Sequence, residues 1–281
     1  MNTTPHTSPM PAMLALCLLP SMFLLCAHRG NHVIFTAGVL LTLLPEGALL
    51  WAFGRIKPRP IFKPLLAASA VGLMASGGVM LCRFVSISAY LSAHRVSGAL
   101  IALPVVVSAA YIASLSQGAQ RRLCSAVLYI TPGVFGAAAL LALKNGSVTN
   151  LHLCAPEPIS DLTSGLRTGA MMFTPALYLL TVRMSGHGGQ LKTGRFVVLK
   201  ALILLLFTLP VIFALGEHIS RSRLPSYDMA AFSKSLLIER FGGLYVLIFA
   251  LSALVHTAVC ANALRLCAAA ITRKEVRCEK A

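Results

Sequence analysis

The sequence predicts an all-α integral membrane protein with about eight transmembrane helices in a single polytopic domain, residues 1–281. Apolar residues make up 57% of the chain and charged residues only 11%. The mean hydropathy is +0.80, and several apolar runs approach the roughly 20 residues that cross a bilayer as a helix. Soluble domains carry about twice this proportion of charged residues, so the composition excludes them.

Apolar segments are predicted as spans near 12–27, 33–53, 65–85, 96–115, 123–143, 165–182, 196–215 and 241–264. The first and the sixth differ from the others because proline interrupts them, at Leu19-Pro20-Ser21 and at Phe173-Thr174-Pro175. Proline cannot donate a backbone hydrogen bond, so we expect helices 1 and 6 to be broken. Two broken segments at matching places in two halves are typical of a transporter binding site near the bilayer midplane.

The basic residues predict that both termini are cytoplasmic. This topology places thirteen Lys and Arg on the cytoplasmic side and eight on the outer side, as the positive-inside rule requires. The net charge of +16 therefore indicates membrane topology and not nucleic-acid binding. The first segment follows a stretch without Lys or Arg and lacks a small-residue cleavage site, so we expect it to be retained and not removed as a signal peptide.

Helix breaks also predict where a ligand binds. A break frees backbone N–H and C=O groups that protein, water or ligand has to satisfy, and helix N-termini attract carboxylates. Prolines that only kink their helices, with compensation from neighbouring groups, are the alternative. The candidate ligand-binding residues near the breaks are Pro20, Ser21, Gly169, Phe173, Thr174 and Pro175.

Ionisable side chains inside apolar segments are the other candidates, because they are costly to place in a membrane. Glu46 lies mid-span and is predicted either to couple to a proton or cation or to be a hydrogen-bonded neutral acid. His256 either lines the pocket or is a hydrogen-bonded packing residue. Lys200 and Arg265 are expected to extend to the interface as anchors, and Arg83 either does the same or meets an anionic ligand from outside.

Several short motifs, in order along nearly the whole chain, resemble the permease-like B-subunits of bacterial spore germinant receptors (GerAB type), of the amino acid-polyamine-organocation (APC) transporter superfamily. The motifs are Leu19-Pro20-Ser21, Arg55 to Pro60, Gly118 to Arg122, Asn145-Gly146-Ser147 with Asn150-Leu151, Leu224-Pro225 and Ile238-Glu239-Arg240.

This resemblance implies a LeuT/APC-like inverted repeat of five helices. Such proteins usually have ten spans, so the second repeat is expected to be incomplete here. A small germinant, for instance an amino acid, would bind where the broken first and sixth helices face the third and eighth. The implied partners are an A-type membrane subunit and a C-type lipoprotein, and the implied location is the inner spore membrane.

The sequence thus predicts a membrane subunit of a nutrient germinant receptor, with no cofactor and no metal. The alternatives are an amino-acid or other solute transporter of the APC superfamily and a degenerate structural subunit that binds no ligand. An enzyme using Glu217, His218 or Asp228 at the outer surface is disfavoured, because the sequence has no hydrolase, metalloprotease or phosphate-loop motif.

Overall fold

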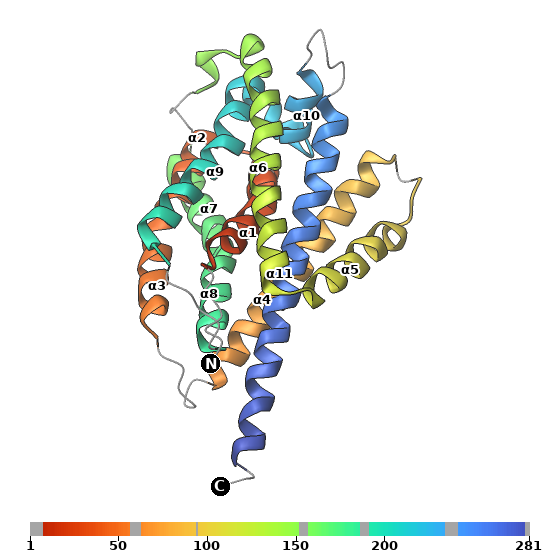
Figure 1. Cartoon of the computed structure of the whole chain (residues 1–281). Coiled ribbons are helices and arrows are strands. Elements are labelled where there is room, and N and C mark those ends of the chain that lie inside the picture. Colours follow the sequence, from red (N-terminus) through yellow and green to blue (C-terminus); the bar gives the residue numbers. More distant parts are fainter. Residues whose placement is uncertain are drawn as a thin grey trace.

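Helices are the only regular elements in the part of the chain described by this computed structural model, residues 8–56, 63–93, 95–151, 157–185, 191–233 and 241–278. The α-helices are α1 (Met10–Phe23), α2 (His32–Leu41), α3 (Leu43–Arg55), α4 (Lys63–Leu91), α5 (Gly98–Ser114), α6 (Gln117–Ala142), α7 (Pro158–Met171), α8 (Thr174–Met184), α9 (Thr193–Leu215), α10 (Pro225–Phe232) and α11 (Phe241–Cys278) (Figure 1). Short 3₁₀ turns include η1 (Leu24–Ala27) and η5 (Gly216–Arg221).

Helices long and apolar enough to cross a membrane confirm the predicted class. In the described chain they are His32–Arg55, Lys63–Leu91, Gln117–Ala142, Thr193–Arg221 and Gly242–Ile271. The chain is therefore an α-helical membrane protein. The predicted first and fourth spans correspond to shorter apolar helices, Met10–Cys26 and Gly98–Ser114, and the predicted sixth span is divided between α7 and α8.

Polar side chains fix where several helices begin. Asn31 Oδ1 accepts hydrogen bonds from the backbone N–H groups of Val33 and Ile34 at the start of α2. Ser97 and Ser116 cap α5 and α6 in the same way. Such caps satisfy N–H groups that have no partner within the helix, so local sequence decides these boundaries.

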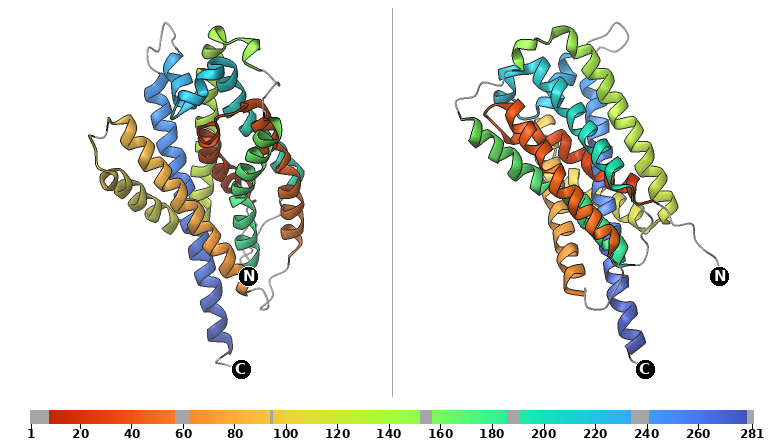
Figure 2. Two further views of the ribbon diagram at one scale, coloured as in Figure 1. Left: turned by 180° about the vertical axis from the view of Figure 1, so that it is seen from behind. Right: turned by 90° about the vertical axis from the view of Figure 1, so that its left-hand side faces the viewer.

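Helix α1 forms the centre of the bundle. All its residues from Met13 to Phe23 are buried, and it packs against α6, α8, α9 and α11. Figure 1 shows it as a short oblique helix among longer ones, whereas α5 lies at the edge against α4 and α11 (Figure 2). A helix that is apolar on every side is suited to such a buried position.

The predicted break of the first helix at Leu19-Pro20-Ser21 is wrong. Helix α1 continues through Pro20 to Phe23 and then tightens into η1. Pro20 removes the N–H that would bond the Leu16 carbonyl, but Nδ1 of His256 on α11 lies 3.2 Å from that oxygen. The alternative in which neighbouring groups compensate for the proline therefore holds at this position.

The predicted interruption of the sixth segment is confirmed. Helix α7 ends at Met171 and α8 begins at Thr174, so that Met172 and Phe173 separate them. Pro175 occupies the first turn of α8, where its missing N–H costs nothing. It also deprives the Met171 carbonyl of the donor that residue i+4 supplies in a continuous helix.

Glycines allow α2 and α7 to cross in direct backbone contact. A Cβ atom at Gly38 would lie 2.4 Å from the Leu162 carbonyl oxygen, and one at Gly165 would lie 2.2 Å from the Phe35 carbonyl oxygen. Small residues permit this approach between membrane helices. The crossing holds the α2–α3 segment against the interrupted segment.

One of the motifs quoted above lies partly, and another wholly, outside the described residues. Lys57 to Pro60 and Ile238 to Arg240 lie outside the described residues. The stretch between α9 and α11 contains the short helix α10, which begins at Pro225.

Candidate functional site

The interruption between α7 and α8 exposes backbone groups in the middle of the bundle. The Met172 and Phe173 N–H groups bond back to Gly169 and Ala170, which closes α7. The Met172 carbonyl lacks its helical partner, because the Ala176 N–H bonds to Phe173 instead. A buried carbonyl of this kind requires another donor.

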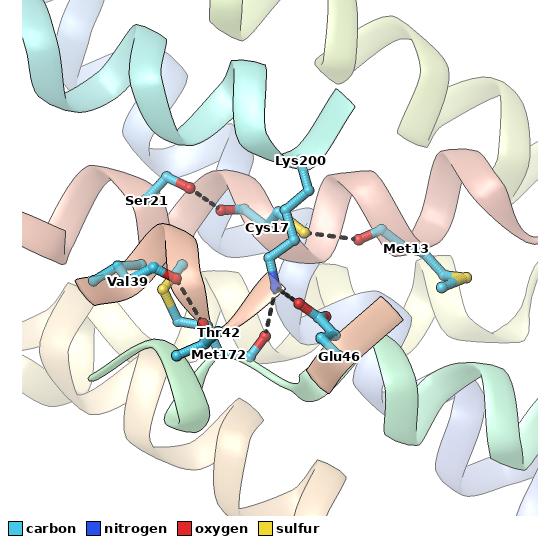
Figure 3. A network of polar contacts seen from close by, with 8 residues as sticks. All are labelled: Met13, Cys17, Ser21, Val39, Thr42, Glu46, Met172 and Lys200. Carbon is cyan, nitrogen blue, oxygen red and sulfur yellow. Dashed lines mark hydrogen bonds and ion pairs between the residues drawn. The ribbon is translucent and has the colours of Figure 1, made fainter. Parts of the chain in front are cut away.

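Lys200 supplies that donor. Its Nζ donates to the Met172 carbonyl at 3.1 Å and to Oε2 of Glu46 at 2.5 Å (Figure 3). The Lys200 and Glu46 side chains are 2% and 1% exposed. The ion pair thus joins α9, α3 and the interruption between α7 and α8.

The ion pair shows that the prediction of Lys200 as an interfacial anchor is wrong. It also identifies a partner for Glu46, which the sequence left without one. Lys200 does not extend to the interface, because a carboxylate and a carbonyl inside the bundle together provide the partners that a buried ammonium needs. Glu46 is a member of an ion pair, and it lies beside the interrupted helix instead of away from it. Its Oε1 has no hydrogen-bond partner among the described residues.

Gly169 positions the interruption against the bend between α2 and α3. A Cβ atom at Gly169 would lie 2.3 Å from Oγ1 of Thr42. Thr42 is buried, and its hydroxyl donates to the Val39 carbonyl at 2.6 Å. Gly169 therefore acts through close packing near the ion pair.

A cavity of about 330 Å³ lies on the other side of the interruption, between α1, α4, α7 and α8; we call it the inner cavity. This volume suits a small organic molecule. Its lining is mostly apolar, and Arg83 is its one charged residue among those that the structure describes. The inner cavity is lined by Pro20, Phe23, Leu24, Gly72, Ala75, Ser76, Val79, Met80, Arg83, Thr168, Ala170, Met171, Met172, Phe173, Thr174 and Leu177.

The inner cavity has one polar pair beside the start of α8. The hydroxyls of Ser76 and Thr174 are 2.7 Å apart and share a hydrogen bond. Thr174 is 4% exposed, whereas Val79 and Met171 on the rim are 51% and 63% exposed. The inner cavity thus reaches from the buried interruption to the outside of the bundle.

The predicted ligand-binding residues divide into two groups. Pro20, Phe173 and Thr174 line the inner cavity. The others do not line it, and each has a packing or hydrogen-bonding role. Ser21 donates to the Cys17 carbonyl at 2.6 Å, Pro175 is buried in the first turn of α8, Gly169 packs on Thr42, and His256 contacts the Leu16 carbonyl.

Sequence reasoning missed the joining of Lys200 to Glu46. The signal for the pair was present, because one acidic and one basic residue in separate apolar segments neutralise each other most readily by contact. Arg83, for which the sequence leaves open an anchoring role or contact with an anionic ligand, lines the inner cavity. Arg265 bonds through Nη1 to the Ser114 carbonyl, at the end of α5.

The candidate enzymatic residues lie on η5 and α10. Glu217 and His218 lie on η5, and Asp228 on α10 accepts a hydrogen bond from Ser222. Among the described residues, no group of three or more His, Cys, Asp or Glu side chains is placed to hold a metal ion.

The fold and the site together define a helical membrane protein with a cavity at an interrupted helix. Comparison with protein-family models, with curated proteins and with solved structures found no match to this chain. The resemblance to germinant-receptor B-subunits therefore stays a prediction.

Proposed function

We propose that this membrane protein binds a small solute, an amino acid with an apolar side chain, in the inner cavity beside the α7–α8 interruption. The observation that carries the proposal is the cavity itself, which brings together Pro20, Phe173 and Thr174 from the two proline-containing segments. Concave apolar sites with a few polar groups are the usual form of small-molecule sites.

The lining provides a partner for each part of such a ligand. The guanidinium of Arg83 is suited to the carboxylate, and the Met171 carbonyl, deprived of its helical donor by Pro175, is suited to the ammonium group. The side chain would rest against Phe23 and Phe173. Lys200 would hold the interruption in place through the Met172 carbonyl.

Helix packing supports a LeuT-like arrangement as part of this proposal. The third segment, α4, packs against α8 and α11, and α1 packs against the same two helices. These are the first, third, sixth and eighth segments of the predicted eight-span repeat. The continuity of α1 through Pro20 departs from that pattern, so within this proposal the interruption of the sixth segment provides the freed backbone groups.

The sequence resemblance favours one version of this proposal, in which the protein senses a germinant. It would then signal to an A-type subunit and a C-type lipoprotein. Occupancy of the inner cavity would shift the α7–α8 interruption between two states of different ligand affinity. Net transport of the same amino acid is the alternative, since one fold serves both functions. Uptake of labelled amino acid into proteoliposomes distinguishes them: sensing predicts saturable binding without flux.

The test is thermal stabilisation of the purified protein by a panel of amino acids and sugars. A ligand at 100 times its dissociation constant adds about 2.7 kcal/mol. Ala75→Trp, which fills the inner cavity, is expected to abolish the effect, whereas Met74→Trp is the matched control because Met74 is on the same helix, does not line the cavity and is 60% exposed. A folded wild-type protein that no solute stabilises would contradict the proposal and favour the structural subunit.

A further inference from the structure

A second hollow, of about 440 Å³, lies near the predicted outer end of α4, and we call it the basic vestibule. It is formed by the turn after η1, the last turns of α4, and η5 with the residues that follow it. The charged residues that line it include Arg29, Arg221 and Arg223, and among the residues that the structure describes no Asp or Glu lines it. The basic vestibule therefore carries a concentrated positive charge.

Two acidic residues that contact the lining of the basic vestibule, Asp161 and Asp228, are already engaged, and a third, Glu217, lies on η5. Asp161 lies 3.0 Å from Nε2 of His28 through Oδ1 and accepts the Asn31 N–H through Oδ2. Asp228 accepts a hydrogen bond from Ser222. Within the described chain, Arg29, Arg221 and Arg223 make no ion pair.

Two of the arginines are held in place by the surrounding structure. The guanidinium of Arg223 lies 4.7 Å from the ring centroid of Tyr90, which also lines the vestibule. Arg29 stands in the turn that Asp161 ties to α7 through the Asn31 N–H. The Arg223 guanidinium and the turn that carries Arg29 are thus ordered, an arrangement that lowers the entropy cost of binding.

Membrane topology does not account for these arginines. The positive-inside rule places Lys and Arg on the cytoplasmic side, whereas Arg29, Arg221 and Arg223 lie in segments predicted to face outward. The serine hydroxyls of the vestibule are also committed, since Ser86 donates to the Cys82 carbonyl and Ser220 to the Glu217 carbonyl. The guanidinium groups remain as charged donors for a ligand.

We propose that the basic vestibule binds a phosphate group, carried by a soluble molecule or by a lipid headgroup. A single carboxylate occupies one guanidinium fork, whereas a phosphate presents several acceptor oxygens to several forks at once. The position at an outer helix end allows both sources to reach the site. This inference is independent of the proposed amino-acid function of the inner cavity.

The two hollows adjoin each other. Arg83 lines the inner cavity and Ser86, one turn further along α4, lines the vestibule. On η1, Leu24 lines the inner cavity and Cys26, two residues further along, lines the vestibule. A phosphate bound in the vestibule would thus lie next to the inner cavity.

The experiment measures stabilisation of the purified full chain by inorganic phosphate against chloride at equal ionic strength. Phosphate is expected to raise the melting temperature of the wild type, and the double variant Arg221→Gln with Arg223→Gln is expected to weaken phosphate binding by about tenfold or more. The control, Arg121→Gln with Arg122→Gln, removes the same charge from the first turns of α6 and is expected to bind normally. Equal effects of phosphate and chloride, or equal loss in both double variants, would overturn the proposal.

Two further measurements are needed. The first distinguishes a soluble phosphate from a lipid headgroup, and the second distinguishes the vestibule proposal from the proposed function of the inner cavity. Phosphatidylglycerol added to the micelles removes the response to inorganic phosphate if a lipid headgroup occupies the site, and leaves it unchanged if the ligand is soluble. Ala75→Trp, which blocks the inner cavity, is expected to retain phosphate binding. Phosphate binding without any amino-acid binding would support the vestibule and reject the proposed function, and the reverse result would reject the vestibule alone.

Discussion

Replacement of Lys200 by methionine tests the role of the buried ion pair. Methionine has nearly the length and shape of the lysine stem, so the change removes the charge with little loss of packing. It leaves Glu46 without its partner and the Met172 carbonyl without its donor. Both groups lie in the interior of the bundle, where water does not replace the lost contacts.

The structure allows the cost to be estimated. At the observed separation of 2.5 Å and an effective dielectric constant of about 20, the two charges attract each other by about 7 kcal/mol. Desolvation offsets most of this attraction, but removal of one partner alone costs about 3–5 kcal/mol because the other charge stays buried. At about 2–4 °C for each kcal/mol, the melting temperature is expected to fall by roughly 6–20 °C.

The assay is thermal unfolding of the purified protein followed by fluorescence. The double variant Lys200→Met with Glu46→Leu is expected to recover most of the loss, since an apolar pair replaces a buried ion pair at little cost. Arg195→Met, an exposed position on the same helix, controls for the general effect of removing a positive charge. If the single variant is as stable as the wild type, or the double variant is no better than the single one, the reasoning is refuted.

Three further predictions concern the packing of the helices and the turn before α2. Gly165→Ala should prevent the α2–α7 crossing and lower the melting temperature strongly. Gly78→Ala is the control and should leave the melting temperature unchanged, because nothing lies within 4 Å of its Cβ position. Equal effects of the two changes would exclude the close contact between α2 and α7. His256→Leu should lower the free energy of unfolding by about 1–3 kcal/mol, because it leaves the buried Leu16 carbonyl unpaired. In a Pro20→Ala background the restored N–H bonds that carbonyl, so the same change should cost much less. An equal cost in both backgrounds would show that His256 does not compensate for Pro20. Burial lowers the pKa of His28 below its ordinary value of 6.5, so the folded state binds fewer protons than the unfolded state and the free energy of unfolding should decrease as the pH falls below about 6.5. Unfolding of the His28→Gln variant, measured between pH 5 and 8, should show a weaker decrease. A pH profile identical to that of the wild type would refute the assignment to His28.

The prolines show how far local sequence carries the prediction of the fold. Pro20 and Pro175 are equally visible in the sequence, and each removes one backbone donor. Only Pro175 lies at an interruption, because the carbonyl freed by Pro20 meets a ring nitrogen of His256 from a helix far along the chain. Whether a proline breaks a helix therefore depends on a tertiary partner that local sequence does not reveal.

In the candidate site, too, some features follow from local sequence and others from packing between distant segments. Composition and apolar runs determine the membrane class, since hydrophobic length and low charge are properties of each segment by itself. The pairing of Lys200 with Glu46 depends on how α9 and α3 are rotated about their axes, and the glycine contacts between α2 and α7 contribute to that rotation. The gathering of Arg83, Thr174 and the inner cavity likewise depends on packing between distant segments.

The sequence by itself thus determined that this protein is helical and lies in a membrane, because hydrophobicity and helix length are properties of each segment alone. Only the tertiary structure decided that α1 is a continuous central helix, that Lys200 is buried and paired, and that an inner cavity and a basic vestibule adjoin at η1 and α4. These features arise where side chains from separate segments satisfy one another in an interior without water.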